Sequence, residues 1–221
     1  MINKTALEQI NHNLQANNTN LIAVTKTHPI EVLKEAYSIG LRVFGENKVQ
    51  ELVSKAEVLP KDIQWHLIGH LQSNKVKYVA PFIHMIHSVD SFKLLQEINK
   101  EGKKNNRIIN CLLQVYIADE DTKFGLDQIE LMALLNNPAL EQLENIQIQG
   151  LMGMATNTNK TEQIRSEFHS LTNLFKTLST SITRKNIEWK EISMGMTSDY
   201  KIAIEEGSTL VRIGSALFGS R

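Results

Sequence analysis

The sequence predicts an α/β protein, a single (β/α)8 TIM barrel with one extra helix at its N-terminus. Eight short apolar segments alternate with segments of helical spacing along the 221 residues. The first apolar segment also lacks the Gly-x-Gly-x-x-Gly turn that is typical of an open dinucleotide-binding sheet. A doubly wound open sheet is the competing architecture. We expect residues 1–221 to form one domain.

The first half of the chain predicts a leading helix over 5–15, because its apolar residues recur at helical spacing. Short apolar runs then end in turn residues, and the strands expected there are 21–26, 41–44, 64–68 and 83–89. Pro29 at a helix start, and Gly40 and Pro60 at helix ends, mark boundaries. The expected helices are 29–40, 48–59, 73–80 and 92–102.

The second half repeats this alternation. Its expected strands are 107–117, 146–154, 189–194 and 209–218. Its expected helices are 127–136, 161–181 and 199–206, and the second of these carries a long apolar stripe. A polar loop over 118–125 follows the fifth strand.

Composition indicates a cytoplasmic protein. The net charge is +0 and the pI is about 7.1, so no overall field attracts nucleic acid or anionic lipid. The single cysteine, Cys111, lies in an apolar run and predicts a buried strand position in a reducing compartment. Residues 1–15 contain no signal-peptide core, and no apolar run is long enough to span a bilayer.

Lys26 is the first candidate site residue, because it ends the apolar segment 21–26 just before Pro29 can open a helix. Apolar surroundings disfavour the charged form of an amine, and the neutral amine attacks carbonyl carbon atoms. On this segment alone, a structural lysine that extends to water is the more common explanation.

Further polar residues stand where other predicted strands end, and in a barrel these ends form the site. They are Asn47, Ser193, Arg212, Gly214 and Ser215. Turns that combine glycine with hydroxyl residues can bind an anion through backbone N–H groups, although helix capping and packing also explain them. Together with an amine, this set suits a phosphorylated carbonyl compound better than a peptide.

Arg212 has apolar neighbours, so its guanidinium requires a buried partner. That partner is either a carboxylate such as Glu46 or Glu191, or a ring nitrogen or anion of a ligand. The strand histidines do not have metal-ligand spacing, so we expect no metal and interpret them as core or rim residues: His66, His84 and His87. Four methionines are expected mainly in the core, although they could line a flat ring: Met152, Met154, Met194 and Met196.

Several motifs resemble one family in order over residues 21–219. They are Val24-Thr25-Lys26-Thr27, Phe44-Gly45-Glu46-Asn47, Val49-Gln50-Glu51, Trp65-His66-Leu67-Ile68-Gly69, Leu71-Gln72-Ser73-Asn74-Lys75, Gly150-Leu151-Met152, Ser193-Met194-Gly195-Met196 and Val211-Arg212-Ile213-Gly214. On these motifs the sequence resembles the pyridoxal phosphate homeostasis protein family, which is related to the N-terminal domain of alanine racemase.

The resemblance implies one barrel that binds pyridoxal 5′-phosphate as a Schiff base on Lys26. It also implies that Arg212 faces the pyridine nitrogen and that Asn47 lies beside the ring. The residues implied to hold the phosphate are Ser193, Gly214 and Ser215. The sequence departs from frequent family residues at three places next to these motifs: His70, Lys48 and Met154-Ala155-Thr156.

These implied contacts predict a carrier of the cofactor rather than an enzyme, with no catalytic residue. An arginine donor keeps the pyridine nitrogen unprotonated, so the ring is a poor electron sink. Racemisation also needs a second acid–base group, which alanine racemase takes from a separate domain that this sequence lacks. We therefore expect a monomer that stores or delivers pyridoxal phosphate to apo-enzymes.

Three alternatives stay open. The first is an amino-acid racemase or another pyridoxal phosphate enzyme, with His70 or Tyr200 as its base. The second is an aldolase that acts on a sugar phosphate through Lys26. The third is an interaction module in which the cofactor is only structural.

Overall fold

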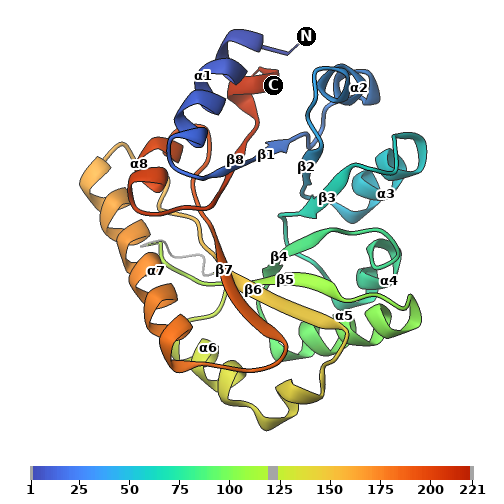
Figure 1. Ribbon diagram of the computed structural model, residues 1–221, viewed down its shortest axis with the longest axis vertical. Coiled ribbons are helices and arrows are strands. Elements are labelled where there is room, and N and C mark those ends of the chain that lie inside the picture. Colours follow the sequence, from blue (N-terminus) through green and yellow to red (C-terminus); the bar gives the residue numbers. More distant parts are fainter. Residues whose placement is uncertain (1, 119–123, 220–221) are drawn as a thin grey trace.

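The computed structural model describes residues 2–118 and 124–219, and within them eight parallel strands close into a barrel (Figure 1). The strands follow one another around the barrel in chain order, and β1 pairs with β8 to close it. The predicted (β/α)8 barrel is confirmed, and the open sheet is excluded. The expected extra helix is α1 (Lys4–Gln15), which Asn3 caps by accepting a hydrogen bond from the backbone N–H of Ala6.

The strands are β1 (Asn20–Val24), β2 (Val43–Glu46), β3 (Gln64–Leu67), β4 (Met85–Val89), β5 (Ile109–Gln114), β6 (Ile146–Met152), β7 (Ile187–Ser193) and β8 (Leu210–Ile213). The helices that follow α1 are α2 (Ile30–Ser38), α3 (Val49–Val58), α4 (Val76–Val79), α5 (Phe92–Lys104), α6 (Gln128–Asn136), α7 (Thr161–Ser181), α8 (Tyr200–Glu205) and α9 (Ser215–Phe218). Short 3₁₀ turns are η1 (Ser73–Lys75) and η2 (Pro138–Gln142).

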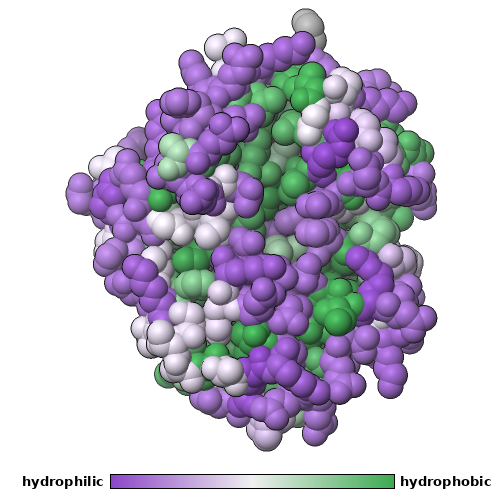
Figure 2. Space-filling model, in the orientation of Figure 1, coloured by the Kyte–Doolittle hydropathy of each residue, from purple (hydrophilic) through white to green (hydrophobic). Residues whose placement is uncertain are grey.

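Two apolar cores stabilise the barrel, because successive side chains of a strand point to opposite faces. One face of the strands packs against the helices, and its largest fully buried side chains are Phe44 and Phe168. The other face forms a smaller cluster inside the barrel: Ile22, Met85, Leu112, Met152 and Leu210. Cys111 is buried in β5 as predicted, and burial raises the pKa of its thiol. Figure 2 shows polar side chains over much of the outer surface, with apolar side chains in the hollow between them.

The last predicted strand, 209–218, is wrong in its second half. β8 ends at Ile213, and the chain then turns at Gly214 into α9. The apolar run that continues to Phe218 has no periodicity that separates a strand from a short helix. α9 instead packs beside α1, and the backbone N–H of Asn3 donates to the carbonyl of Leu217 at 2.9 Å.

The other boundaries differ by a few residues. β1 ends at Val24, so Lys26 lies in the turn beyond the strand rather than at its last position. β5 is shorter than the predicted 107–117. Residues 119–123 of the predicted loop over 118–125 lie outside the described residues. Among the helices that the structure describes, none combines the length and apolar character needed to cross a bilayer.

Candidate functional site

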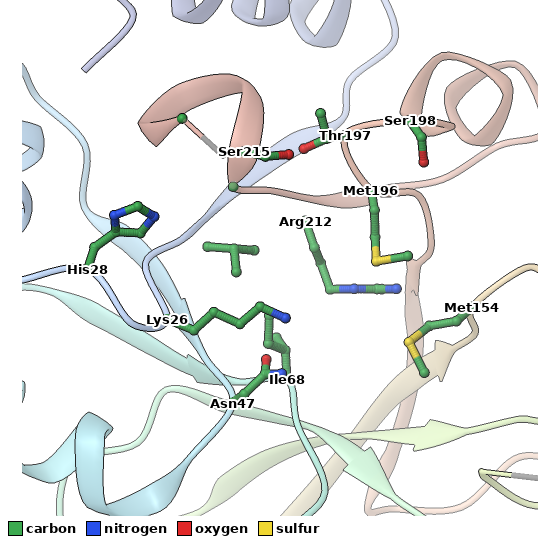
Figure 3. Close-up of a pocket in the computed structure, with 13 residues that line it drawn as sticks. Lys26, His28, Asn47, Ile68, Met154, Met196, Thr197, Ser198, Arg212 and Ser215 are labelled. Carbon is green, nitrogen blue, oxygen red and sulfur yellow. The ribbon is translucent and has the colours of Figure 1, made fainter. Parts of the chain in front are cut away.

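A cavity of about 630 Å³ opens where β1, β2, β6, β7 and β8 end, and Figure 3 shows the side chains that line it. Five of the six predicted site residues line this cavity together: Lys26, Asn47, Arg212, Gly214 and Ser215. In Figure 3 the Lys26 and Asn47 side chains lie on one side of the cavity, and the hydroxyls of Thr197 and Ser215 lie on the opposite side. The fold therefore brings an amine, a guanidinium and several hydroxyls to one hollow.

The turn that carries Lys26 is held by a buried ion pair. The Lys55 side chain, from α3, is 4% exposed, and its Nζ donates to the backbone carbonyl of Thr25 at 2.7 Å. It also donates to Glu46 Oε1 at 2.7 Å and to Glu51 Oε1 at 2.6 Å. The Thr25 hydroxyl donates to the same Glu46 oxygen at 2.7 Å. Burial raises the pKa of Glu46, while these hydrogen bonds act in the opposite direction.

The residue after Lys26 has a backbone conformation that requires support. Thr27 has a φ of 66°, in the left-handed region that residues with a Cβ rarely adopt. Its backbone N–H donates to Glu51 Oε1, the same oxygen that accepts from Lys55. The two flanking residues of Lys26 are therefore both fixed by side chains of β2 and α3.

Asn47 is positioned by close packing of two turns. A Cβ added to Gly69 would lie 2.4 Å from the carbonyl oxygen of Asn47, a contact that no side chain tolerates. The Ser88 hydroxyl donates to the carbonyl of Gly69 at 2.6 Å and holds this turn from β4. Gly69 therefore allows the turn after β3 to lie directly against the turn that presents Asn47.

Arg212 is a buried cation beside the cavity. The residue is 4% exposed, and burial lowers the pKa of its guanidinium to about 10. Its Nη1 donates to the backbone carbonyl and the hydroxyl of Ser193 at 2.8 and 2.6 Å, and its Nη2 donates to the carbonyl of Gly153 at 3.0 Å. Within the described residues no carboxylate lies within ion-pair distance of it, although the charge of Asp199 acts on it from farther away.

The expected structural partners of Arg212 are therefore wrong. Glu46 pairs with Lys55 on the helix side of the barrel, and Glu191 accepts from the Thr209 hydroxyl at 2.6 Å. Strand parity explains the position of Glu46, because a Cβ on Gly45 would point at Ile22 inside the barrel, so the neighbouring Glu46 faces outward.

Ser193, the sixth predicted site residue, does not line the cavity. It is fully buried behind Arg212, and its hydroxyl lies 3.0 Å from His87 Nδ1. His87 Nε2 lies 2.8 Å from His66 Nδ1. The structure therefore separates Ser193 from the predicted phosphate ligands and places it in a buried polar chain.

The histidines and methionines singled out in the sequence are divided between the core and the surface, and some of the methionines line the cavity. His66 and His87 are buried in the core, and His84 is half-buried with its ring centroid 5.2 Å from that of His66. No group of three or more histidine, cysteine or acidic side chains suited to a metal occurs in residues 2–118 and 124–219. Met152 and Met194 are fully buried, whereas two exposed methionines line the cavity: Met154 and Met196.

Of the three departures from the family motifs, the loop 154–156 contributes Met154 to the cavity lining, whereas His70 and Lys48 are exposed and lie outside that lining. His70 is exposed, and its Nδ1 lies 3.3 Å from Asp90 Oδ2. Lys48 precedes α3 and is exposed. The loop 154–156 is held by Thr156, whose N–H and hydroxyl each donate to the Glu167 carboxylate at 2.7 Å.

Two lining residues, Thr197 and Ser198, were absent from the predicted ligand set. The sequence did carry a signal for them, because they stand in the turn with Asp199 that opens α8. The Lys55–Glu46 pair had no comparable signal. A lysine within an amphipathic helix is usually exposed, and only the tertiary fold shows that α3 buries it.

Comparisons with known proteins identify relatives of this chain. The chain matches the family "Alanine racemase, N-terminal domain" over residues 4–221. It is also 41% identical over 202 residues to the "Pyridoxal phosphate homeostasis protein" of Aquifex aeolicus, a match that covers 91% of this chain and 86% of the relative.

Solved structures of PipY from Synechococcus elongatus have the same fold. PipY without PLP matches with a TM-score of 0.89 at 37% identity, covering 97% of this chain and 99% of that chain. PipY with PLP bound matches with a TM-score of 0.86 at 35% identity, with the same coverage. This chain and PipY therefore share sequence as well as fold over nearly their whole length.

Proposed function

Because the chain belongs to the pyridoxal phosphate homeostasis protein family, we propose that it binds pyridoxal 5′-phosphate and contributes to intracellular homeostasis of this cofactor. It stores or delivers the cofactor, with little or no catalytic turnover. Residues 1–221 act as one cofactor-binding barrel domain.

The observation that carries this proposal is the buried Arg212 guanidinium at the edge of the cavity. Burying a cation is costly unless it is paired, and the three acceptors of Arg212 in the described residues are neutral oxygens. A guanidinium has five N–H donors, so two are left for a ligand. An electron-rich ring nitrogen, or an anion, fits that position.

The other lining residues fit the same cofactor. When bound, pyridoxal phosphate supplies an aldehyde that condenses with an amine, and an anionic phosphate group. Lys26 and Asn47 both line the cavity, where Lys26 would provide the amine and Asn47 would contact the ring. Gly214 and Ser215 would bind the phosphate, and we add the two hydroxyls of Thr197 and Ser198, which also line the cavity. Ser193 contributes indirectly, as an acceptor that holds Arg212.

The roles proposed for the same residues support low turnover. With the cofactor bound, Arg212 would donate to the ring nitrogen and keep it unprotonated, which would limit the stabilisation of a carbanion. A racemase needs a second acid–base group, and neither candidate lines the cavity. His70 is exposed beside Asp90, and the Tyr200 hydroxyl accepts from Asn13 Nδ2 of α1 at 3.3 Å.

Three further parts of the proposal concern the cell. We propose that the protein is monomeric and cytoplasmic, and that apo-enzymes dependent on pyridoxal phosphate receive the cofactor from it. The near-zero net charge and the absence of a membrane-spanning helix among the described residues support neither a nucleic-acid nor a membrane partner.

Borohydride trapping tests the proposal directly. The purified protein with pyridoxal phosphate should absorb in the visible range, lose that band on reduction, and yield one modified peptide that contains Lys26. Lys26→Ala should abolish the adduct without unfolding the barrel, whereas Lys48→Ala should not change it. An adduct on another lysine would contradict the Lys26 assignment, and rapid exchange of L- and D-amino acids would contradict low turnover.

A further inference from the structure

A chain of hydrogen bonds crosses the inside of the barrel beneath the cavity and ends on Arg212. It joins four buried side chains from four strands. Arg212 Nη1 lies 2.6 Å from Ser193 Oγ, which lies 3.0 Å from His87 Nδ1. His87 Nε2 lies 2.8 Å from His66 Nδ1. The other ring nitrogen, His66 Nε2, is buried without a hydrogen-bond partner in the described residues.

The direction of the donors follows from counting protons along this chain. A guanidinium only donates, so Ser193 Oγ accepts from Arg212. In one arrangement the Ser193 hydroxyl then donates to His87 Nδ1, and His87 Nε2–H donates to His66 Nδ1. That arrangement leaves a single buried group without a partner, the N–H of His66 Nε2.

The reverse arrangement leaves two groups without partners. His66 Nδ1–H would donate to His87, and His87 Nδ1–H would donate to Ser193. The Ser193 hydroxyl proton would then have no acceptor among its recorded contacts, and His66 Nε2 would keep an unpaired lone pair. Because each unsatisfied buried polar group costs about 1–3 kcal/mol, the first arrangement is favoured.

We infer that His87 and His66 are positioning residues for the cofactor. With protons on both Nε2 atoms, they hold the Ser193 hydroxyl as an acceptor toward Arg212. This contact keeps the remaining N–H groups of Arg212 aimed into the cavity. The identity of the ligand in this inference rests on the proposed function. The hydrogen-bond direction rests only on the geometry of the four side chains.

The electrostatics of the interior agree with two neutral imidazoles. Burial lowers the pKa of His66 to about 3, and burial also lowers the pKa of His87 well below its ordinary value. The nearby positive charge of Arg212 acts in the same direction on His87. A protonated His87 could not accept from Ser193, and it would repel the guanidinium.

The tautomers can be measured in the unmodified protein. Long-range ¹H–¹⁵N correlation spectra of uniformly ¹⁵N-labelled protein at pH 7 should assign the Nε2–H tautomer to both His66 and His87. The Nδ1–H tautomer, or a charged imidazolium, at His87 would overturn the inference. This measurement needs neither a variant nor the cofactor.

Variants then test the effect on the cofactor. Pyridoxal phosphate labelled with ¹⁵N in its ring should report an unprotonated, hydrogen-bonded nitrogen in the wild type at pH 6–8. His87→Leu removes the acceptor of Ser193, so the nitrogen signal should shift and the dissociation constant should rise about tenfold. His87→Asn, whose amide oxygen can accept from Ser193, should restore both values toward the wild type. Met85→Leu, in the same strand and interior, should change neither.

The outcomes separate the inference from the proposed function. If the wild type does not bind pyridoxal phosphate, the proposed function fails, and the tautomers still decide the hydrogen-bond direction. If the wild type binds but His87→Leu matches Met85→Leu, the positioning role is wrong. If His87→Leu does not fold, His87→Asn tests the positioning role instead. A ring-nitrogen signal close to that of the wild type supports the role, and a shifted signal contradicts it.

Discussion

Two buried cations lie on opposite sides of the barrel wall and have different kinds of partner. Lys55, between the strands and α3, contacts two carboxylates, Glu46 and Glu51, at 2.7 and 2.6 Å. Arg212, inside the barrel, contacts a serine and two backbone carbonyls. Both residues are less than 5% exposed. The first charge is neutralised by the protein, and the second is not.

The difference separates structural from ligand-binding charge. A cation with a carboxylate partner has its charge compensated whether or not a ligand is present. A cation held only by neutral acceptors has a fixed orientation, but its charge is not compensated by the protein and can pair with an anion. On this basis Lys55 fixes the turn of Lys26, and we propose that Arg212 is the cation that binds the ligand. Four experiments test the comparison.

Lys55→Met should give the largest effect on stability. It leaves Glu46 buried without its cation, and breaking a buried pair in this way costs about 3–5 kcal/mol. Urea unfolding measures the change. The matched control is Lys100→Met, because Lys100 forms an exposed pair with Glu97 at 3.0 Å, and such pairs contribute about 1 kcal/mol or less. Equal losses in the two variants would remove the distinction.

Arg212→Met should affect binding more than folding. The stability change should stay within about 1 kcal/mol, because three lost hydrogen bonds are offset by removal of a buried charge. Affinity for pyridoxal phosphate should fall by about 2–3 kcal/mol, roughly a 30- to 150-fold rise in the dissociation constant by titration. A stability loss as large as that of Lys55→Met would mean that Arg212 is structural.

Acid should weaken the barrel through its buried histidines. Their folded pKa values lie below the unfolded value, so the unfolded chain binds more protons as the pH falls below about 6.5. Between pH 7 and 5.5 each should remove about 1 kcal/mol of stability. Burial raises the carboxyl pKa values of Glu46 and Asp199, which act in the opposite sense at lower pH. His87→Asn should remove the contribution of His87 and leave those of His66 and the half-buried His84, whose pKa burial also lowers, in urea unfolding at the two pH values.

Thr197→Val should give the smallest effect. It removes one hydroxyl near the proposed phosphate position and keeps the shape of the side chain, so affinity should fall by about 1 kcal/mol. Thr177→Val is the control, because its hydroxyl donates within α7 to the carbonyl of Asn173 at 2.9 Å. If binding is unchanged by Thr197→Val, the phosphate does not contact this hydroxyl.

Much of the fold follows from local patterns in the sequence. Strand ends marked by polar residues placed Asn47 and Arg212 at one rim, because parallel strands of a barrel end at the same face. The prediction of a strand over 209–218 was wrong in its second half, because an apolar run without polar alternation is compatible with both strand and helix. Boundary positions such as that of Lys26 depend on how far each strand pairs, which the sequence does not specify.

The side-chain partners were harder to predict than the positions. Which side chains of a strand point inward depends on packing. Glu46, a predicted partner of Arg212, lies on the outer face of the barrel and pairs with Lys55. Ser193 was predicted at the correct strand end, but its depth behind Arg212 is a tertiary property. The histidine chain likewise joins residues from β3, β4 and β7 that no local spacing connects.

The contact between Gly69 and Asn47 has a consequence for engineering this barrel. Since the two turns touch through their main chains, neither can be redesigned alone. A library that varies the segment after β3 would also displace Asn47 in the cavity lining. Losses of binding in such a library would follow from this displacement rather than from the new side chains. Grafting both turns as one unit avoids this coupling.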